Sequence, residues 1–140
     1  MAKNRHGLDD EAIALEAPPL RVLTNPVGLD IVLSNLLDNA VKYSGDEVHI
    51  EVKACGTGDG HVAIAIIDTG VGIPRNQLKR VFHRFYRVGN EMTRTRKGTG
   101  LGLYIVKETL RSLKGSIRAT SPGEGQGSVF TVILPGVPHV

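Results

Sequence analysis

The sequence has one cysteine, no tryptophan and an aromatic content of only 4% in 140 residues. A single cysteine, Cys55, excludes an intramolecular disulfide framework and a cysteine-rich metal centre. So few aromatic side chains argue against a surface that stacks nucleic-acid bases, and the net charge of +3 is mild. The five histidines show no metal-ligand spacing. We therefore expect neither a nucleic-acid partner nor a metal cluster.

The chain also has no hydrophobic run long enough to span a bilayer, and residues Met1–Asp10 are too polar for a signal peptide. From this we expect a cytoplasmic chain without direct membrane contact. The length fits one domain. The composition places that domain at residues 20–135, between a tail or linker remnant at 1–19 and a short tail at 136–140.

The clearest helical pattern covers about Val27–Tyr43. Thr24 or Asn25 is suited to cap this helix, and Pro26 fits its first position. One apolar stripe at helical spacing is expected to face a sheet; it consists of Leu29, Leu33, Leu36 and Ala40.

The remaining elements follow from alternation, apolar runs and turn residues. Short helical pieces are expected over residues 74–86, and a second helix begins near Leu103 and has Gly115 as its C-cap. The expected strands are Leu20–Leu23, Glu47–Lys53, Val62–Ile67, Ser116–Thr120 and Ser128–Leu134.

The apolar strand at 62–67 ends abruptly in a carboxylate, Asp68, and Gly70 and Gly72 follow at alternate positions. Glycine lets backbone lie flat against a planar ligand, and the carboxylate can accept hydrogen bonds from a bound group. We interpret this stretch as the floor of a nucleotide pocket. The alternative is an ordinary strand-to-helix turn, because Asp and Gly are common turn residues.

A polar stripe on the first helix consists of Asn35, Asn39 and Lys42. Asparagine is unfavourable inside helices, so two of them on one face suggest a polar task. The alternative is that this stripe simply faces water.

A long basic loop, Arg87–Lys97, leads into the glycine-rich stretch Gly98–Leu103. The stretch superficially matches a dinucleotide fingerprint, but no strand precedes it as a Rossmann unit requires. A P-loop is also absent. What remains is a helix N-terminus that exposes backbone N–H groups, which suits phosphate, under a basic lid that can close over the anion.

Together these stretches predict an adenine-binding carboxylate, a phosphate-binding helix start and an amide oxygen for Mg²⁺, which prefers oxygen ligands. Their order resembles the catalytic, ATP-binding domain of bacterial sensor histidine kinases, in the Bergerat-type ATPase superfamily. The resemblance rests on the following boxes: N box Asn35–Tyr43, G1 box Asp68–Gly72, F box Val81–Arg87, G2 box Gly98–Leu103 and a final glycine-rich box Gly125–Phe130.

The resemblance implies a fold, namely an α/β two-layer sandwich in which a mixed, mostly antiparallel sheet carries its helices on one face. It also implies ATP and Mg²⁺ as cofactors, with Asn39 on the metal and with Asn39, Lys42 and Arg87 as the catalytic residues. The implied nucleotide-binding residues are Asn35, Asn39, Lys42, Tyr43, Asp68, Gly70, Gly72, Ile73, Arg87, Gly98, Thr99, Gly100, Leu101, Gly102 and Leu103.

Two positions depart from the pattern. Hydrolysing members of the superfamily have a glutamate base four residues before the metal asparagine. This chain has Asn35 there, whose amide cannot take up a proton. This disfavours hydrolysis and fits transfer to a protein histidine. His83 replaces the usual acidic residue of the F box, which puts any contact through that side chain in doubt.

The implied activity is that of an ATP-dependent protein histidine kinase in two-component signalling. A phosphoacceptor histidine on a dimeric helical hairpin is absent from this chain, so we expect no autophosphorylation by it alone. The implied partners are the phosphoacceptor domain of a parent kinase and, through that parent, a response regulator. A membrane anchor on the parent is left open. The alternatives are a serine kinase of the anti-sigma-factor type and a non-catalytic nucleotide-binding module.

Overall fold

The computed structural model describes residues 13–16, 22, 24–43, 49–83, 102–123 and 125–136, with the backbone alone for 13–16. Its sheet has five strands in the order β1-β2-β3-β5-β4. β1 runs parallel to β2, and the other neighbours are antiparallel. The elements are β1 (Ile13–Glu16), α2 (Pro26–Lys42), β2 (Ile50–Gly56), β3 (His61–Asp68), η2 (Arg75–Gln77), α3 (Gly102–Ser112), β4 (Ser116–Thr120) and β5 (Ser128–Pro135).

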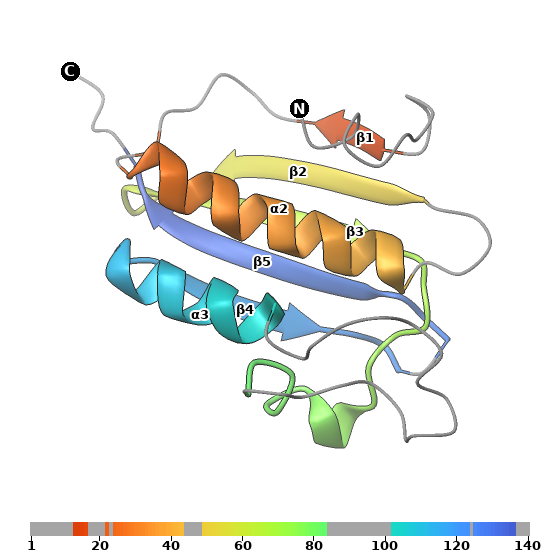
Figure 1. Cartoon of the computed structure of the whole chain (residues 1–140). Coiled ribbons are helices and arrows are strands. Elements are labelled where there is room, and N and C mark those ends of the chain that lie inside the picture. Colours follow the sequence, from red (N-terminus) through yellow and green to blue (C-terminus); the bar gives the residue numbers. More distant parts are fainter. Residues whose placement is uncertain are drawn as a thin grey trace.

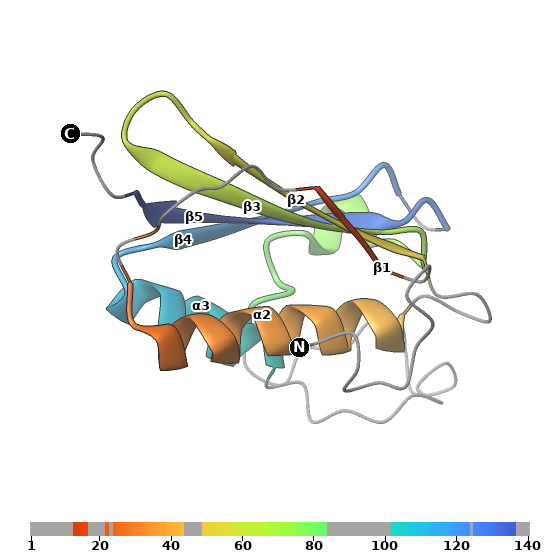
Figure 2. The ribbon, with the colours of Figure 1, turned by 90° about the horizontal axis from the view of Figure 1, so that it is seen from above.

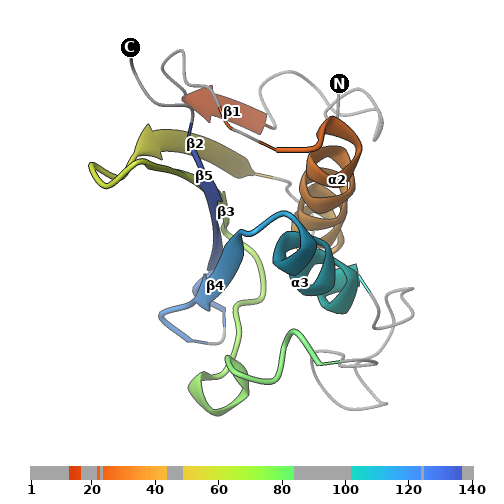
Figure 3. The same ribbon diagram turned by 90° about the vertical axis from the view of Figure 1, so that its left-hand side faces the viewer.

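Both α-helices lie on one face of this sheet (Figures 2 and 3). The expected two-layer sandwich, with a mixed and mostly antiparallel sheet, is therefore confirmed. None of the helices in the described part of the chain has the length and apolar character needed to cross a membrane.

The expected cap of the first helix is confirmed at Asn25, with Pro26 in the first turn. The Asn25 side-chain oxygen accepts hydrogen bonds from the backbone N–H groups of Val27 (2.9 Å) and Gly28 (3.2 Å). The helix has no carbonyl of its own for these two donors, so the cap stabilises its first turn, typically by about 1 kcal/mol.

The expectation of a tail over residues 1–19 is wrong for β1. Ile13 pairs with Ile50 and Glu16 pairs with Lys53, so this segment forms an edge strand of the sheet. In the expected strand at 20–23, Val22 forms only an isolated bridge to Gly136, and its neighbours lie outside the described residues. Val22 thus pairs at the end of β5 rather than at β2, and only the pairing with β2 identifies residues 13–16 as the edge strand.

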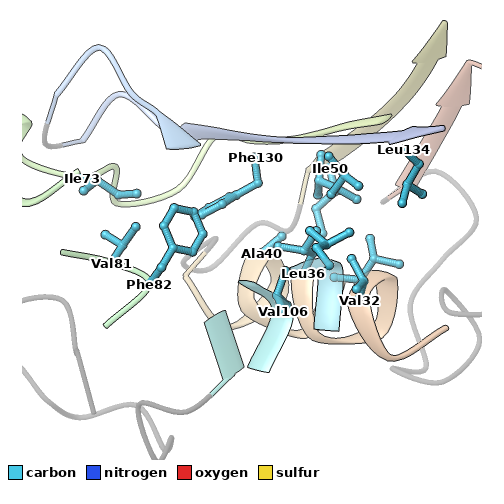
Figure 4. Close-up of a cluster of buried hydrophobic side chains, with 14 residues drawn as sticks. Val32, Leu36, Ala40, Ile50, Ile73, Val81, Phe82, Val106, Phe130 and Leu134 are labelled. Carbon is cyan, nitrogen blue, oxygen red and sulfur yellow. The ribbon is translucent and has the colours of Figure 1, made fainter. Parts of the chain in front are cut away.

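The core fills the space between the sheet and the two helices (Figure 4). Phe130 of β5 is 2% exposed and meets Phe82 edge-on, with ring centroids 6.1 Å apart. Ile73 and Val81 belong to the same buried cluster. The chain after β3 is thus held against the end of the sheet by apolar packing, although η2 is only one short turn.

The end of α3 differs in detail from the expectation. Lys114, not Gly115, has the left-handed backbone conformation, with φ of 61°. The Gly115 N–H donates to the Leu110 carbonyl (2.8 Å) and the Lys114 N–H to the Arg111 carbonyl (3.2 Å), which is a Schellman ending. Gly115 is needed for another reason, since a Cβ there would lie 2.7 Å from the Ile133 carbonyl oxygen of β5.

Candidate functional site

Asp68 is the last residue of β3. It lies on the face of the sheet that carries the helices and is only 4% exposed. Its Oδ1 accepts a hydrogen bond from the Gly70 N–H (2.9 Å), and its Oδ2 accepts one from the Ser128 hydroxyl (2.6 Å). Ser128 is the direct partner of Asp68 in the β3–β5 register. A carboxylate has about four lone-pair positions, so this arrangement fixes the carboxylate while leaving it able to accept from a ligand.

The loop after Asp68 is clamped from two sides. The Val71 N–H donates to the carbonyl of Tyr43, the C-cap of α2 (3.0 Å), and the Gly125 N–H donates to the Val71 carbonyl (2.6 Å). The Gly127 N–H donates to the Gly70 carbonyl (3.1 Å). The end of the asparagine-bearing helix, the Asp68 loop and the β4–β5 turn therefore form one hydrogen-bonded unit.

The close packing of this loop against the β4–β5 turn explains why glycine occurs at positions 72 and 127. Gly72 and Gly127 have positive φ angles of 71° and 76°. A Cβ on Gly72 would collide with the Gly123 carbonyl, and a Cβ on Gly127 would collide with the Asp68 carbonyl. The structure requires glycine at both positions because two backbone segments meet there, independently of any approach to a planar ligand.

Ile73 is placed differently from its glycine neighbours. Its side chain is 4% exposed within the buried cluster, so it joins the loop to the core. Its backbone N–H donates to the hydroxyl of Ser121, which follows β4 (3.1 Å).

The polar stripe of α2 is half-buried at Asn35, Asn39 and Lys42, rather than facing open water. The Asn35 Nδ2 donates to the Ile31 carbonyl one turn earlier (2.8 Å). With the amide nitrogen engaged there, the Oδ1 lies beside the start of α3, 3.5 Å from the place a Cβ on Gly102 would occupy.

α2 ends, β3 ends and α3 begins toward the same end of the molecule (Figure 1). The structure thus brings together Asp68, Gly70, Gly72 and Ile73, connects them to Tyr43, and sets Asn35 beside Gly102; Leu103 follows in the first turn of α3. Arg87, Gly98, Thr99, Gly100 and Leu101 lie outside the described residues.

Two serines at this end were missed by the sequence-based prediction of site residues, Ser121 and Ser128. The final glycine-rich box includes Ser128, but only the strand register shows that it faces Asp68. In the sequence, Ser121 is typical of a turn residue before Pro122. Only the structure shows that its hydroxyl accepts a hydrogen bond from the Ile73 N–H.

A second polar cluster, on the β2–β3 hairpin, lies at the opposite end of β3. There Asp59 accepts a hydrogen bond from the Thr57 hydroxyl and contacts His61 Nδ1 (3.2 Å). These two contacts hold the pKa of the Asp59 carboxyl below its usual value of 3.8. The cluster is exposed, and no group of three or more His, Cys, Asp or Glu suited to a metal occurs among the described residues.

Known protein families and curated proteins include relatives of this chain. Residues 24–138 match the model of the histidine kinase-, DNA gyrase B-, and HSP90-like ATPases. The sensor-like histidine kinase SenX3 of Mycolicibacterium smegmatis is 39% identical over 128 residues, which are 91% of this chain and 33% of SenX3. The chain thus spans about a third of the length of that relative.

Solved structures give the same result. The mycobacterial sensor histidine kinase MprB superposes with a TM-score of 0.79 at 31% identity, covering 98% of this chain and 88% of that structure. Full-length ShkA in complex with AMPPNP has a TM-score of 0.77 at 25% identity, covering 99% of this chain and 28% of ShkA. This chain belongs to the histidine kinase-, DNA gyrase B-, and HSP90-like ATPase family, and its relatives are sensor histidine kinases.

Proposed function

We propose that this chain binds MgATP and donates the γ-phosphate to a histidine on a separate dimeric domain of a parent sensor kinase. The observation that carries the proposal is the fixed carboxylate of Asp68 beside the end of α2. A buried carboxylate held by two donors on its own chain is preorganised to accept from the amino group of adenine. The AMPPNP, an ATP analogue, in the related ShkA structure supports an adenine nucleotide as ligand.

The remaining residues have roles along the nucleotide. Gly70, Gly72 and Ile73 lie beneath the base and Tyr43 beside it, while Lys42, Arg87 and the segment Gly98–Leu103 contact the phosphates. Each role follows from the family resemblance, and the clamp around Val71 supports those near the base.

Asn39 and Asn35 define the polar side of the site. Asn39 presents one amide oxygen, and Mg²⁺ accepts one such protein oxygen when phosphates and water complete its shell. When bound, the ion neutralises charge that develops on the phosphates. Asn35 has its Nδ2 committed to Ile31, and an amide has no basicity for activating water.

The chemistry fits transfer to histidine. A neutral imidazole nitrogen attacks with its own lone pair, the bond from the γ-phosphorus to the bridging oxygen breaks, and ADP leaves. The imidazolium then loses its N–H proton to solvent, so no base on this chain is required. Positioning and fixed cations carry such a reaction.

Calorimetry with MgATP tests the binding step. We expect micromolar to millimolar affinity for the wild type and a loss of at least about tenfold for Asp68→Asn, which removes the charge at nearly constant shape. Asp59→Asn on the distant hairpin is the matched control and should bind like the wild type. Equal affinity of the wild type and Asp68→Asn would remove the carboxylate from the site.

Transfer is tested by adding a purified dimeric histidine-bearing domain in trans with labelled ATP. Acid-labile, base-stable phosphate on that domain supports a histidine kinase. Label on a serine would point to the anti-sigma type of kinase, and binding without transfer to a nucleotide-binding module.

A further inference from the structure

Ser121 is the one side chain, among the described residues, that joins the Gly70–Ile73 loop to the β4–β5 turn. Its Oγ accepts hydrogen bonds from the N–H groups of Ile73 (3.1 Å) and Gly123 (3.2 Å). It donates to the Gly127 carbonyl (2.7 Å), with the Gly123 carbonyl farther away at 3.2 Å. A hydroxyl has one proton and two lone pairs, so Ser121 already uses all of its hydrogen-bonding positions. We call this connection between Ser121, Ile73, Gly123 and Gly127 the joint.

The contacts of Ser121 continue to Asp68. Gly127, whose carbonyl Ser121 holds, donates its own N–H to Gly70. The next residue, Ser128, donates to the Asp68 carboxylate. The same hydroxyl therefore helps to set the position of both ends of the Asp68 loop: the carboxylate through β5, and Ile73 directly.

The other hydrogen bonds between this loop and the turn, from Gly125 to Val71 and from Gly127 to Gly70, are backbone to backbone. They use no side-chain atom, so the substitution Ser121→Ala removes none of their donors or acceptors. Ser121 is different, because removing its hydroxyl leaves the N–H of the buried residue Ile73 without that partner, which is costly.

We infer that Ser121 is a positioning residue for the base of the nucleotide, a role that rests on the proposed function. It acts through Ile73, Gly127 and Ser128 and touches no ligand itself. Because this joint is at the base side of the site, its loss should weaken recognition of adenine and leave recognition of the phosphates unchanged.

Amide hydrogen exchange tests the joint without any nucleotide. In Ser121→Ala, we expect exchange of the Ile73 and Gly123 amides to accelerate by about tenfold, since each loses its acceptor. Ile66 in the middle of β3 should exchange as in the wild type. Ser112→Ala is the matched control, because that hydroxyl donates to the Thr109 carbonyl (2.7 Å) on an exposed helix end.

Competition binding tests the role. We expect Ser121→Ala to weaken ATP affinity by about five- to tenfold and to leave inorganic tripolyphosphate affinity within about twofold. Ser121→Thr keeps the hydroxyl and should restore the ATP affinity. A purely structural defect would instead lower both affinities together.

Four results distinguish the positioning role, the hydrogen-bonded joint at Ser121 and the proposed function. Faster Ile73 exchange with unchanged ATP affinity in Ser121→Ala would overturn the positioning role, and so would parallel loss of ATP and tripolyphosphate binding. Unchanged exchange would overturn the joint itself. Failure of the proposed function looks different, since Asp68→Asn would then bind ATP as the wild type does.

Discussion

At the scale of single residues, the site depends on a carboxylate that is buried but not isolated. Burial of an unpaired charge is costly, and hydrogen bonds to it recover much of that cost. Asp68 obtains one bond from its own loop and one from the opposite strand. This makes its orientation a property of the folded chain before any ligand arrives, which lowers the cost of binding.

Ser128→Ala should therefore weaken MgATP binding by about three- to tenfold, since Oδ2 of Asp68 loses a charge-assisted hydrogen bond. Calorimetry on the variant measures the effect, and Ser128→Thr, which keeps the hydroxyl, should bind more tightly than the alanine variant. Wild-type affinity in Ser128→Ala would show that Gly70 alone suffices to orient the carboxylate.

At the scale of elements, contacts with neighbouring segments determine how each α-helix ends. α2 begins with a side-chain cap, and it ends at its C-cap Tyr43, whose carbonyl accepts a hydrogen bond from the Val71 N–H of the Asp68 loop. α3 ends with Lys114 in the left-handed region and Gly115 against β5. Gly115, predicted from the sequence as the C-cap, therefore follows the left-handed residue by one position.

This geometry predicts opposite effects for adjacent substitutions. Lys114→Gly should raise the free energy of unfolding by up to about 1 kcal/mol, because glycine accepts a positive φ without strain. Gly115→Ala should lower the free energy of unfolding by about 1–3 kcal/mol, because its Cβ would crowd the Ile133 carbonyl. Denaturant unfolding of both variants measures this, and stabilisation by Gly115→Ala would contradict the assignment.

At the scale of the whole molecule, one apolar core holds the sheet, the two helices and the segment that follows the site. Phe130 lies at the centre of that connection, between the sheet and Phe82 (Figure 4). Lys107 of α3 lies over the same Phe82 ring, with its Nζ 5.9 Å from the centroid. Phe82, at the start of the F box, is therefore packed against both the sheet and the helical layer.

Phe130→Ala should cost about 3–5 kcal/mol of stability, because it leaves a large cavity where the layers meet. Thermal unfolding measures the loss. Val27→Ala is the matched control, because Val27 is 69% exposed and its truncation should change stability by no more than about 0.5 kcal/mol. Near-equal effects of the two substitutions would mean that the layers are held together elsewhere.

The sequence by itself determined the local features: a helix cap at Thr24 or Asn25, the apolar run that ends in Asp68, the apolar stripe of α2 and the order of the boxes. These depend on neighbours within about a turn or a strand, so their pattern is written in adjacent residues. The fold class followed from that order and was confirmed.

Only the tertiary structure decided which segments meet. The choice of residues 13–16 for the sheet edge, the pairing of Ser128 with Asp68 and the bond from Ser121 to Ile73 join residues 37, 60 and 48 positions apart. Such contacts depend on strand register and on the close approach of two backbones at Gly72 and Gly127. No local pattern encodes them, because the energy that favours them arises only when the sheet is assembled.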